Sequence, residues 1–201
     1  MPFFSEETLS EISAADGSRY INPSKLDAGE NLELIFMQDT PVSYWTIFAE
    51  SASGERPRSF RCLRKPSKAE MLKEMGGDWQ PALCPEEWES TKFKGQREEL
   101  KPEHVVPVYN KKTGLIEILC IKQKSIFDGL KRKSLKEKYA DLTEHDIEIT
   151  KVKPFASPWY EVEINPADDS DHKKAQTAWE KALDDGFDLT RYLDNGDPFF
   201  A

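Results

Sequence analysis

Residues 105–121, VVPVYNKKTGLIEILCI, contain two apolar runs separated by a polar turn at 110–114. Short apolar runs bounded by turn residues are typical of buried strands, so this stretch predicts a β-hairpin. The basic segment 122–139 follows, and the helical spacing of its apolar residues predicts the main α-helix. Residues 146–151, DIEITK, and 159–164, WYEVEI, alternate apolar and polar side chains. This alternation predicts two half-buried strands.

Three further strands are predicted nearer the N-terminus, over residues 32–37, 44–50 and 58–63. The second of them is rich in aromatic and β-branched residues, which strands favour. Hairpin, helix and hairpin in this order can close a small five-stranded barrel of the OB type. We therefore expect a mostly β protein: an OB-like barrel with one main α-helix, an irregular insertion and acidic tails.

One domain is expected at residues 31–166, because the predicted strands all lie within it. Residues 1–30 are polar and acidic, and predict either a mobile N-terminal arm or a disordered end without function. A short helix is predicted at 66–76. An irregular insertion follows at about 76–102, where tryptophans and prolines fit no regular element. Residues 167–201 are expected to form an acidic C-terminal tail with a short helix.

Composition excludes some classes of protein. The chain has 201 residues, of which 38% are hydrophobic and 32% are charged. This is polar for a globular protein but does not indicate a chain disordered throughout. No apolar run has the length of a membrane span, and the N-terminus lacks the basic and long apolar segments of a secretory signal. We expect no membrane partner and a cytoplasmic protein.

Charge is unevenly distributed along the chain. The net charge is -9, which alone would argue against binding to nucleic acid. Acids dominate up to Glu55, but the segment from Arg56 to Lys65 has only basic charged residues. Residues 101–160 are basic on balance, and the chain is acidic again after Asn165. A basic centre between acidic ends predicts an anionic partner for the centre.

The second half of the chain also resembles a known family. The elements that carry the resemblance are Val108-Tyr109, the Lys-rich turn, Leu115 to Ile121, the helix start Lys124-Ser125-Ile126-Phe127, the strand Asp146-Ile147-Glu148-Ile149 and its partner Trp159-Tyr160. This layout resembles the single-stranded DNA-binding proteins of tailed phages. The resemblance extends loosely to residues 32–63 and not to the first thirty residues. It implies an OB fold that coats single-stranded DNA during DNA replication, recombination or repair, in the host cytoplasm if the chain is a viral protein.

The resemblance also bears on metal binding, because some phage relatives hold a zinc ion. Cys62, Cys84 and His104 could form such a site, although a zinc site normally includes a closely spaced ligand pair, which is missing here. The alternative is that Cys62, Cys84 and Cys120 are small buried thiols, which suits a reducing compartment. No metal or other cofactor is predicted.

The predicted DNA-binding residues combine bases with aromatic rings, because a guanidinium or ammonium neutralises phosphate while a ring stacks on a base. Alternation places Arg58 and Phe60 on one face of their strand and Arg61 on the other. Some of the rings must instead fill the barrel, and Trp45 and Tyr109 are the candidates for exposed ones. The predicted set is Trp45, Phe48, Arg58, Phe60, Arg61, Arg64, Tyr109, Lys111, Lys112, Lys122, Lys124, Lys151, Lys153, Phe155 and Trp159. The basic triplet Lys131 to Lys133 is interpreted as an ordinary solvated helix face.

The C-terminus predicts a partner-binding tip. It resembles the acidic Asp-Pro-Phe end of bacterial single-stranded DNA-binding proteins, which replication and recombination proteins grip. The matching residues are Asp194, Asp197, Pro198, Phe199 and Phe200. The tip has few acids and Ala201 follows the Phe pair, so it departs from the bacterial pattern. The alternative is an amphipathic tail that docks on its own domain.

Catalysis is not predicted. The sequence lacks the phosphate-binding glycine motifs and the G-x-S-x-G nucleophile motif, and no histidine adjoins a cysteine or serine nucleophile. The other functions left open are a protein-interaction adaptor with an OB-like barrel and a DNA-processing nuclease.

Overall fold

The computed structural model describes residues 19–51, 58–62, 88–90, 92–93, 96–97, 101–152, 159–194 and 196–199. The chain divides into two compact units. Unit 1 contains the described residues of Met1–Asp39 and Pro107–Trp179, and unit 2 contains those of Thr40–Val106 and Glu180–Ala201. This division differs from the single domain expected at 31–166, because residues from Thr40 onward already leave unit 1.

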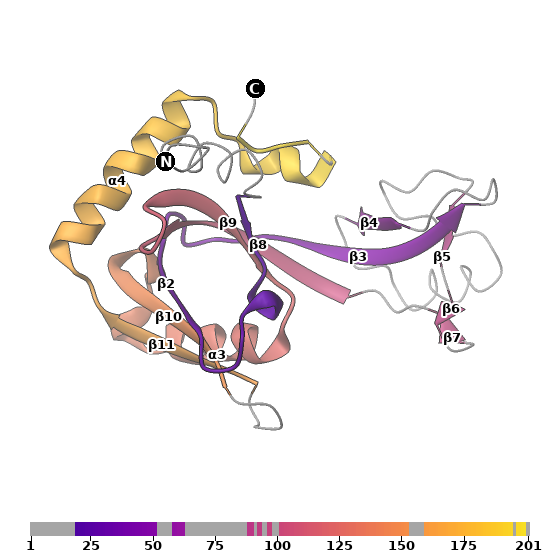
Figure 1. Cartoon of the computed structure of the whole chain (residues 1–201), viewed down its shortest axis with the longest axis horizontal. Coiled ribbons are helices and arrows are strands. Elements are labelled where there is room, and N and C mark those ends of the chain that lie inside the picture. The colour runs from indigo at the N-terminus through magenta and orange to yellow at the C-terminus, as the bar shows by residue number, and fades with distance from the viewer. Residues whose placement is uncertain are drawn as a thin grey trace, which may run out of the picture. The chain divides into compact units, whose positions relative to one another are not determined.

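Unit 1 is built on a mixed sheet whose strand order is β1-β9-β8-β2-β10-β11. Figure 1 labels the strands of this order from β9 to β11. The strands are β1 (Tyr20–Ile21), β2 (Asn31–Phe36), β8 (Lys101–Asn110), β9 (Leu115–Ile121), β10 (His145–Lys151) and β11 (Tyr160–Pro166). The unit boundary falls within β8. β1 runs parallel to β9, whereas β2 is antiparallel to both β8 and β10. The predicted strands at 105–109, 115–121, 146–151 and 159–164 are confirmed.

The register places apolar residues side by side across three strands. Leu34 of β2 pairs with Ile147 of β10, which pairs with Ile164 of β11. All three side chains are buried. Along β11, Tyr160, Val162 and Ile164 are buried and the glutamates between them are exposed. This is the alternation that the sequence predicted, and it gives the sheet one core face.

The hairpin between β8 and β9 turns at the predicted residues. The Gly114 N–H donates to the Asn110 carbonyl at 2.8 Å. Gly114 has a φ of 71°, a left-handed conformation that glycine adopts without steric cost. The Asn110 side chain adds to the turn by accepting a hydrogen bond from the Lys112 N–H at 3.0 Å.

Two α-helices that flank this sheet lie within the described residues. α3 (Lys124–Ser134) connects β9 to β10 and packs beside β11, with Ile126 and Leu130 buried. It ends before the predicted limit of residue 139. Leu135, the residue that follows it, is 79% exposed. Short 3₁₀ helices η2 (Glu137–Tyr139) and η3 (Leu142–Glu144) follow it. α4 (Asp169–Asp184) lies in the predicted C-terminal tail, and it buries Ala175 and Trp179.

Unit 2 is organised around one long strand, β3 (Val42–Ser51). β3 pairs antiparallel with β4 (Arg58–Cys62), β5 (Trp88–Ser90) and the first half of β8. A separate small hairpin joins β6 (Lys92–Phe93) to β7 (Gln96–Arg97). Residues 88–97 thus include strands that the sequence did not predict. The remaining element is the 3₁₀ helix η4 (Leu189–Asp194).

The N-terminal boundary of the fold was predicted wrongly. Tyr20 and Ile21 pair with β9, and η1 (Pro23–Lys25) contains a fully buried proline. The Tyr160 hydroxyl donates to the Pro23 carbonyl at 3.2 Å. Residues from Arg19 onward therefore belong to the fold, not to a mobile arm. The helix predicted at 66–76 lies outside the described residues.

Within the described ranges, no strand pairing connects β11 to the β1-β9 end of the path. The sheet is therefore open, and the predicted barrel is not shown. No helix in this part of the chain is long and apolar enough to cross a membrane.

Candidate nucleic-acid interface

A groove with a volume of about 990 Å³ lies between α3 and β11 of unit 1. α3 and the residue before it contribute one wall, and the first residues of β11 contribute the other. The lining residues are Gln123, Lys124, Ser125, Asp128, Gly129, Arg132, Lys133, Trp159, Tyr160, Glu161, Val162 and Glu163.

A glycine brings the two walls together. A Cβ atom at Gly129 would lie 3.0 Å from Cγ2 of Val162, closer than ordinary van der Waals contact. Gly129 and Val162 are both buried. The missing side chain therefore lets the helix approach the strand, and the groove opens beside this contact.

The groove follows the edge of β11. Successive side chains of a strand point to opposite faces, yet Tyr160, Glu161, Val162 and Glu163 all line the groove. A cavity that borders both faces of a strand must run along the strand edge. β11 is the last strand of the path and pairs with β10 alone among the described strands. Its outer edge thus has no strand partner among the residues that the structure describes.

Three bases and three acids line this groove. Lys124, Arg132 and Lys133 come from α3, and two of the acids, Glu161 and Glu163, come from β11. The third acid, Asp128, lies one helical turn from both Lys124 and Arg132. Within the described part of the chain, none of these six side chains forms a hydrogen bond or an ion pair. No described residue therefore competes with a ligand for these charges.

Trp159 supplies an exposed aromatic ring at the start of β11. Its side chain is 66% exposed, whereas the neighbouring Tyr160 is 5% exposed. The Trp159 carbonyl accepts a hydrogen bond from the Val152 N–H at 3.0 Å, which fixes the backbone at this point. A tryptophan held in this way contributes little to the core. It can instead stack on a planar group in the groove.

The other predicted DNA-binding residues of unit 1 differ in their exposure and in their contacts. Tyr109 is only 6% exposed, so the prediction that its ring is exposed is wrong. Lys151 is half-buried, and its ammonium donates to the carbonyls of Ser24 and Leu26. Lys112 and Lys122 are exposed, as a phosphate contact requires.

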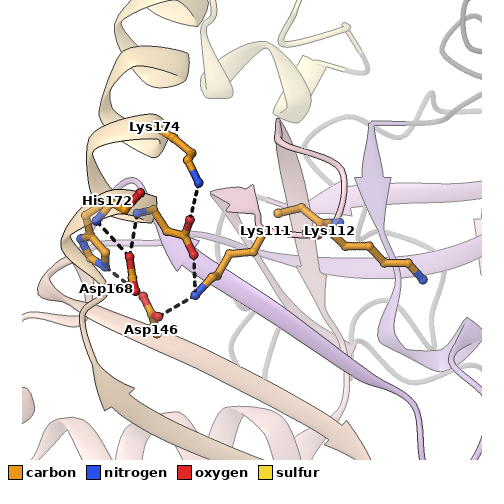
Figure 2. A network of polar contacts seen from close by, with 9 residues as sticks. Lys111, Lys112, Asp146, Asp168, His172 and Lys174 are labelled. Carbon is orange, nitrogen blue, oxygen red and sulfur yellow. Dashed lines mark hydrogen bonds and ion pairs between the residues drawn. The ribbon is translucent and has the colours of Figure 1, made fainter.

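Lys111 belongs to an ion-pair network that attaches α4 to the sheet. Its Nζ lies 2.8 Å from Asp146 and 2.9 Å from Asp171. Figure 2 shows Lys111 directed into this network and Lys112 directed away from it. His172 Nε2 lies 3.0 Å from Asp146, and Lys174 lies 2.8 Å from Asp171. Lys111 is therefore a docking residue of α4 and not the predicted phosphate ligand.

The pKa values in this network follow from its contacts. Burial alone would lower the pKa of Lys111, but hydrogen bonds to Asp146 and Asp171 outweigh it and raise that pKa. Hydrogen bonds from Lys174 and Lys111 lower the pKa of Asp171 to about 2. Lys111 and Asp171 are thus both charged at neutral pH in the folded protein.

Unit 2 contains the predicted β3 and β4 residues. Trp45 is half-buried and pairs with Cys62, and Arg61 pairs with Thr46 across the hairpin. The backbones of Phe48, Arg58 and Phe60 lie in the same hairpin, but their side chains are not described. Arg64, Lys153 and Phe155 lie outside the described residues.

A buried polar cluster lies where β3 meets β8 in unit 2. Glu103 is 6% exposed and accepts hydrogen bonds from the Tyr44 hydroxyl at 2.8 Å and the Thr46 hydroxyl at 3.0 Å. Tyr192 of η4 reaches the Tyr44 hydroxyl at 3.4 Å. Burial, together with Tyr192 and Glu103, raises the pKa of Tyr44. The cluster is satisfied internally, which favours a packing role.

His104 lies beside this cluster, and its Nδ1 is 2.8 Å from the Ser43 hydroxyl. Burial lowers its pKa. No group of metal-ligating side chains occurs among the described residues, and Cys84 is not one of them.

The C-terminal tip is packed where it is described. Phe199 is 8% exposed and its ring lies edge-on to Phe187, with centroids 5.0 Å apart. The Asp188 N–H donates to the Pro198 carbonyl at 2.9 Å, and Asp197 accepts from the Phe199 N–H at 3.0 Å. A partner that grips Pro198 and Phe199 must first displace them. The Asp194 side chain is not described, and Phe200 lies outside the described residues.

The groove thus contains two of the predicted residues, Lys124 and Trp159, and several that the sequence did not indicate. Arg132 and Lys133 were interpreted as a solvated helix face, and the acids were not considered. The sequence could have indicated this groove through the eight-residue spacing of Lys124 and Arg132, which places both bases on one side of a helix. No protein-family model, curated protein or solved structure matches this chain.

Proposed function

We propose that this protein binds single-stranded DNA without regard to sequence and coats it during phage-type replication, recombination or repair. The observation that carries the proposal is the exposed Trp159 ring beside Lys124, Arg132 and Lys133, which form no ion pair with any other described residue. Stacking of a base on an aromatic ring contributes about 1–3 kcal/mol and tolerates any base. The three cations can neutralise phosphates of the same strand.

Strand order supports the proposal. The path β9-β8-β2-β10-β11 with a helix between β9 and β10 is the arrangement expected of an OB fold that is not closed. OB folds bind oligonucleotides with strands two and three and with the loops after strands one and four. The connection from β10 to β11 corresponds to the loop after strand four, and it ends at the exposed Trp159.

The test compares single-stranded and duplex oligonucleotides. Labelled oligo-dT and a duplex of equal length are titrated with the protein at two salt concentrations. We expect preference for the single strand and an affinity that falls with salt, because bound cations release counterions. Equal affinity for both ligands would contradict the proposal.

Trp159→Ala tests the groove itself. We expect oligo-dT affinity to fall by the stacking energy of about 1–3 kcal/mol, with the salt dependence unchanged. Leu135→Ala is the matched control, because Leu135 is 79% exposed, follows α3 directly and does not line the groove. Both variants should fold like the parent protein because both side chains are solvent-exposed.

A protein-interaction adaptor is the second candidate. The open edge of β11 favours it, since an extended peptide can add to an exposed strand. The balance of acids and bases in the groove would also suit a peptide of mixed charge. Such an adaptor would bind neither oligo-dT nor duplex in the titration.

A further inference from the structure

The two walls of the groove differ in chemistry. All three cations come from α3, whereas Trp159, Glu161 and Glu163 come from β11 and the residue before it. A single nucleic-acid strand has a corresponding asymmetry, with phosphates along one side and bases along the other. A strand in the groove would place its phosphates toward α3 and its bases toward β11.

The carboxylates on the β11 wall restrict which base edges fit beside Trp159. An ionised carboxylate only accepts hydrogen bonds. Cytosine and adenine present exocyclic amines, which donate, whereas thymine and uracil present the O4 acceptor at the corresponding position. Glu161 and Glu163 are exposed and form no hydrogen bond or ion pair with other described residues. They can therefore accept from a base amine, but they repel a carbonyl oxygen.

We propose that the groove between α3 and β11 prefers amine-bearing bases, with Glu161 and Glu163 as its specificity-determining residues. The inference rests on the proposed binding of single-stranded DNA and adds a bias in base composition to it. The bias is modest, because stacking and phosphate contacts are common to all bases. One carboxylate–amine contact should change the affinity ratio between two otherwise similar bases about fivefold, which is the low end of the discrimination that base contacts provide.

Oligo-dC and oligo-dU of equal length form the matched pair of probes. Their bases have the same ring size and no methyl group, and they differ in the amine or carbonyl at position four and in the protonation of N3. Competition is measured in mildly alkaline buffer, where cytosine is unprotonated. We expect the parent protein to bind oligo-dC about fivefold more tightly than oligo-dU.

The double variant Glu161→Gln/Glu163→Gln separates specificity from charge. A glutamine amide both donates and accepts, so the preference for oligo-dC should fall toward one. Affinity for oligo-dU should rise, because two negative charges that repel the O4 carbonyl and the polyanionic strand are removed. Glu137→Gln is the control: Glu137 lies on η2 outside the groove, and its removal should leave the dC-to-dU ratio unchanged.

Two results would overturn the inference while leaving the proposed function intact. The first is equal affinity of the parent protein for oligo-dC and oligo-dU. The second is an unchanged preference in the double variant. Binding of neither oligonucleotide would overturn the proposed function together with the inference.

Discussion

Gly129 of α3 and Val162 of β11 are in closer contact than a side chain at position 129 would allow. A Cβ there would lie 3.0 Å from Cγ2 and 3.2 Å from Cβ of Val162. Valine is stiff at χ1, and Val162 is buried, so it has little room to move away. The distance between the walls of the groove therefore depends on this pair.

Gly129→Val is expected to destabilise the protein by about 1–3 kcal/mol, the usual cost of overpacking a core. Urea unfolding of the variant measures the loss. Shortening the opposing residue should relieve it: in a Val162→Ala background the penalty should shrink by at least about 0.5 kcal/mol, as expected for residues in contact. An equal penalty in both backgrounds would show that α3 and β11 do not meet here.

Lys124→Gln and Arg132→Gln should weaken binding of single-stranded DNA and reduce its salt dependence. Each lost phosphate contact should flatten the slope of log affinity against log salt by about 0.7. Lys173→Gln is the control, because Lys173 is an exposed base on α4 and does not line the groove. If the control flattens the slope as much as the groove variants do, the groove is not the binding site.

Asp171 should contribute to stability in a defined range of pH. Its pKa falls from the ordinary value of 3.8 to about 2 in the folded protein, through contacts with Lys174 and Lys111. A lowered carboxyl pKa gives stabilisation that is complete above the unfolded value and is lost as pH falls through the folded value. We expect the stability difference between the parent and Asp171→Asn to be largest above about pH 4 and to be lost as the pH falls through about 2.

Urea unfolding of both proteins across this pH range measures that difference. Asp169→Asn serves as the control, because Asp169 occupies the same helical turn but forms no ion pair among the described residues. A parent and Asp171→Asn difference that stays constant from about pH 5 to about pH 2 would contradict the expectation.

Phe199→Ala tests whether the C-terminal tip is packed or free in solution. Because Phe199 is buried against Phe187, its truncation should cost about 3–5 kcal/mol, as for other buried phenylalanines. Thermal unfolding measures this, with Leu183→Ala as the control at a 48% exposed position. An unchanged melting temperature would indicate a free tip, which partners could grip without displacing it.

Local sequence patterns predicted the strands and helices of unit 1 well. The alternation in DIEITK and WYEVEI is a property of single strands, and a burial pattern of period two follows from it directly. β1 was missed because two residues in a polar context carry no periodic signal. Their strand conformation depends on pairing with Ile118 and Leu119, far along the chain.

Site residues were harder to predict because their roles depend on distant partners. The sequence predicts Lys111 and Lys151 as phosphate ligands, but in the folded chain they contact Asp171 and Leu26, which are distant in the sequence. Tyr109 pairs with Ile35 in the interior of the sheet, which buries its ring. Lys124 and Trp159 are exposed, and their role in binding DNA stays a prediction.

The ladder between β2 and β8 makes the connection between these strands tolerant of changes in length. Phe36 pairs with Val108, and the Met37 N–H donates to the Pro107 carbonyl at 3.0 Å, so unit 1 holds both ends of the connection together. Closure entropy grows only logarithmically, by about 0.6 kcal/mol for each doubling of a flexible loop. Long and short connections at this point thus cost the sheet nearly the same. The segment after Met37 is a place where the chain can acquire or lose whole structural modules while unit 1 keeps its fold.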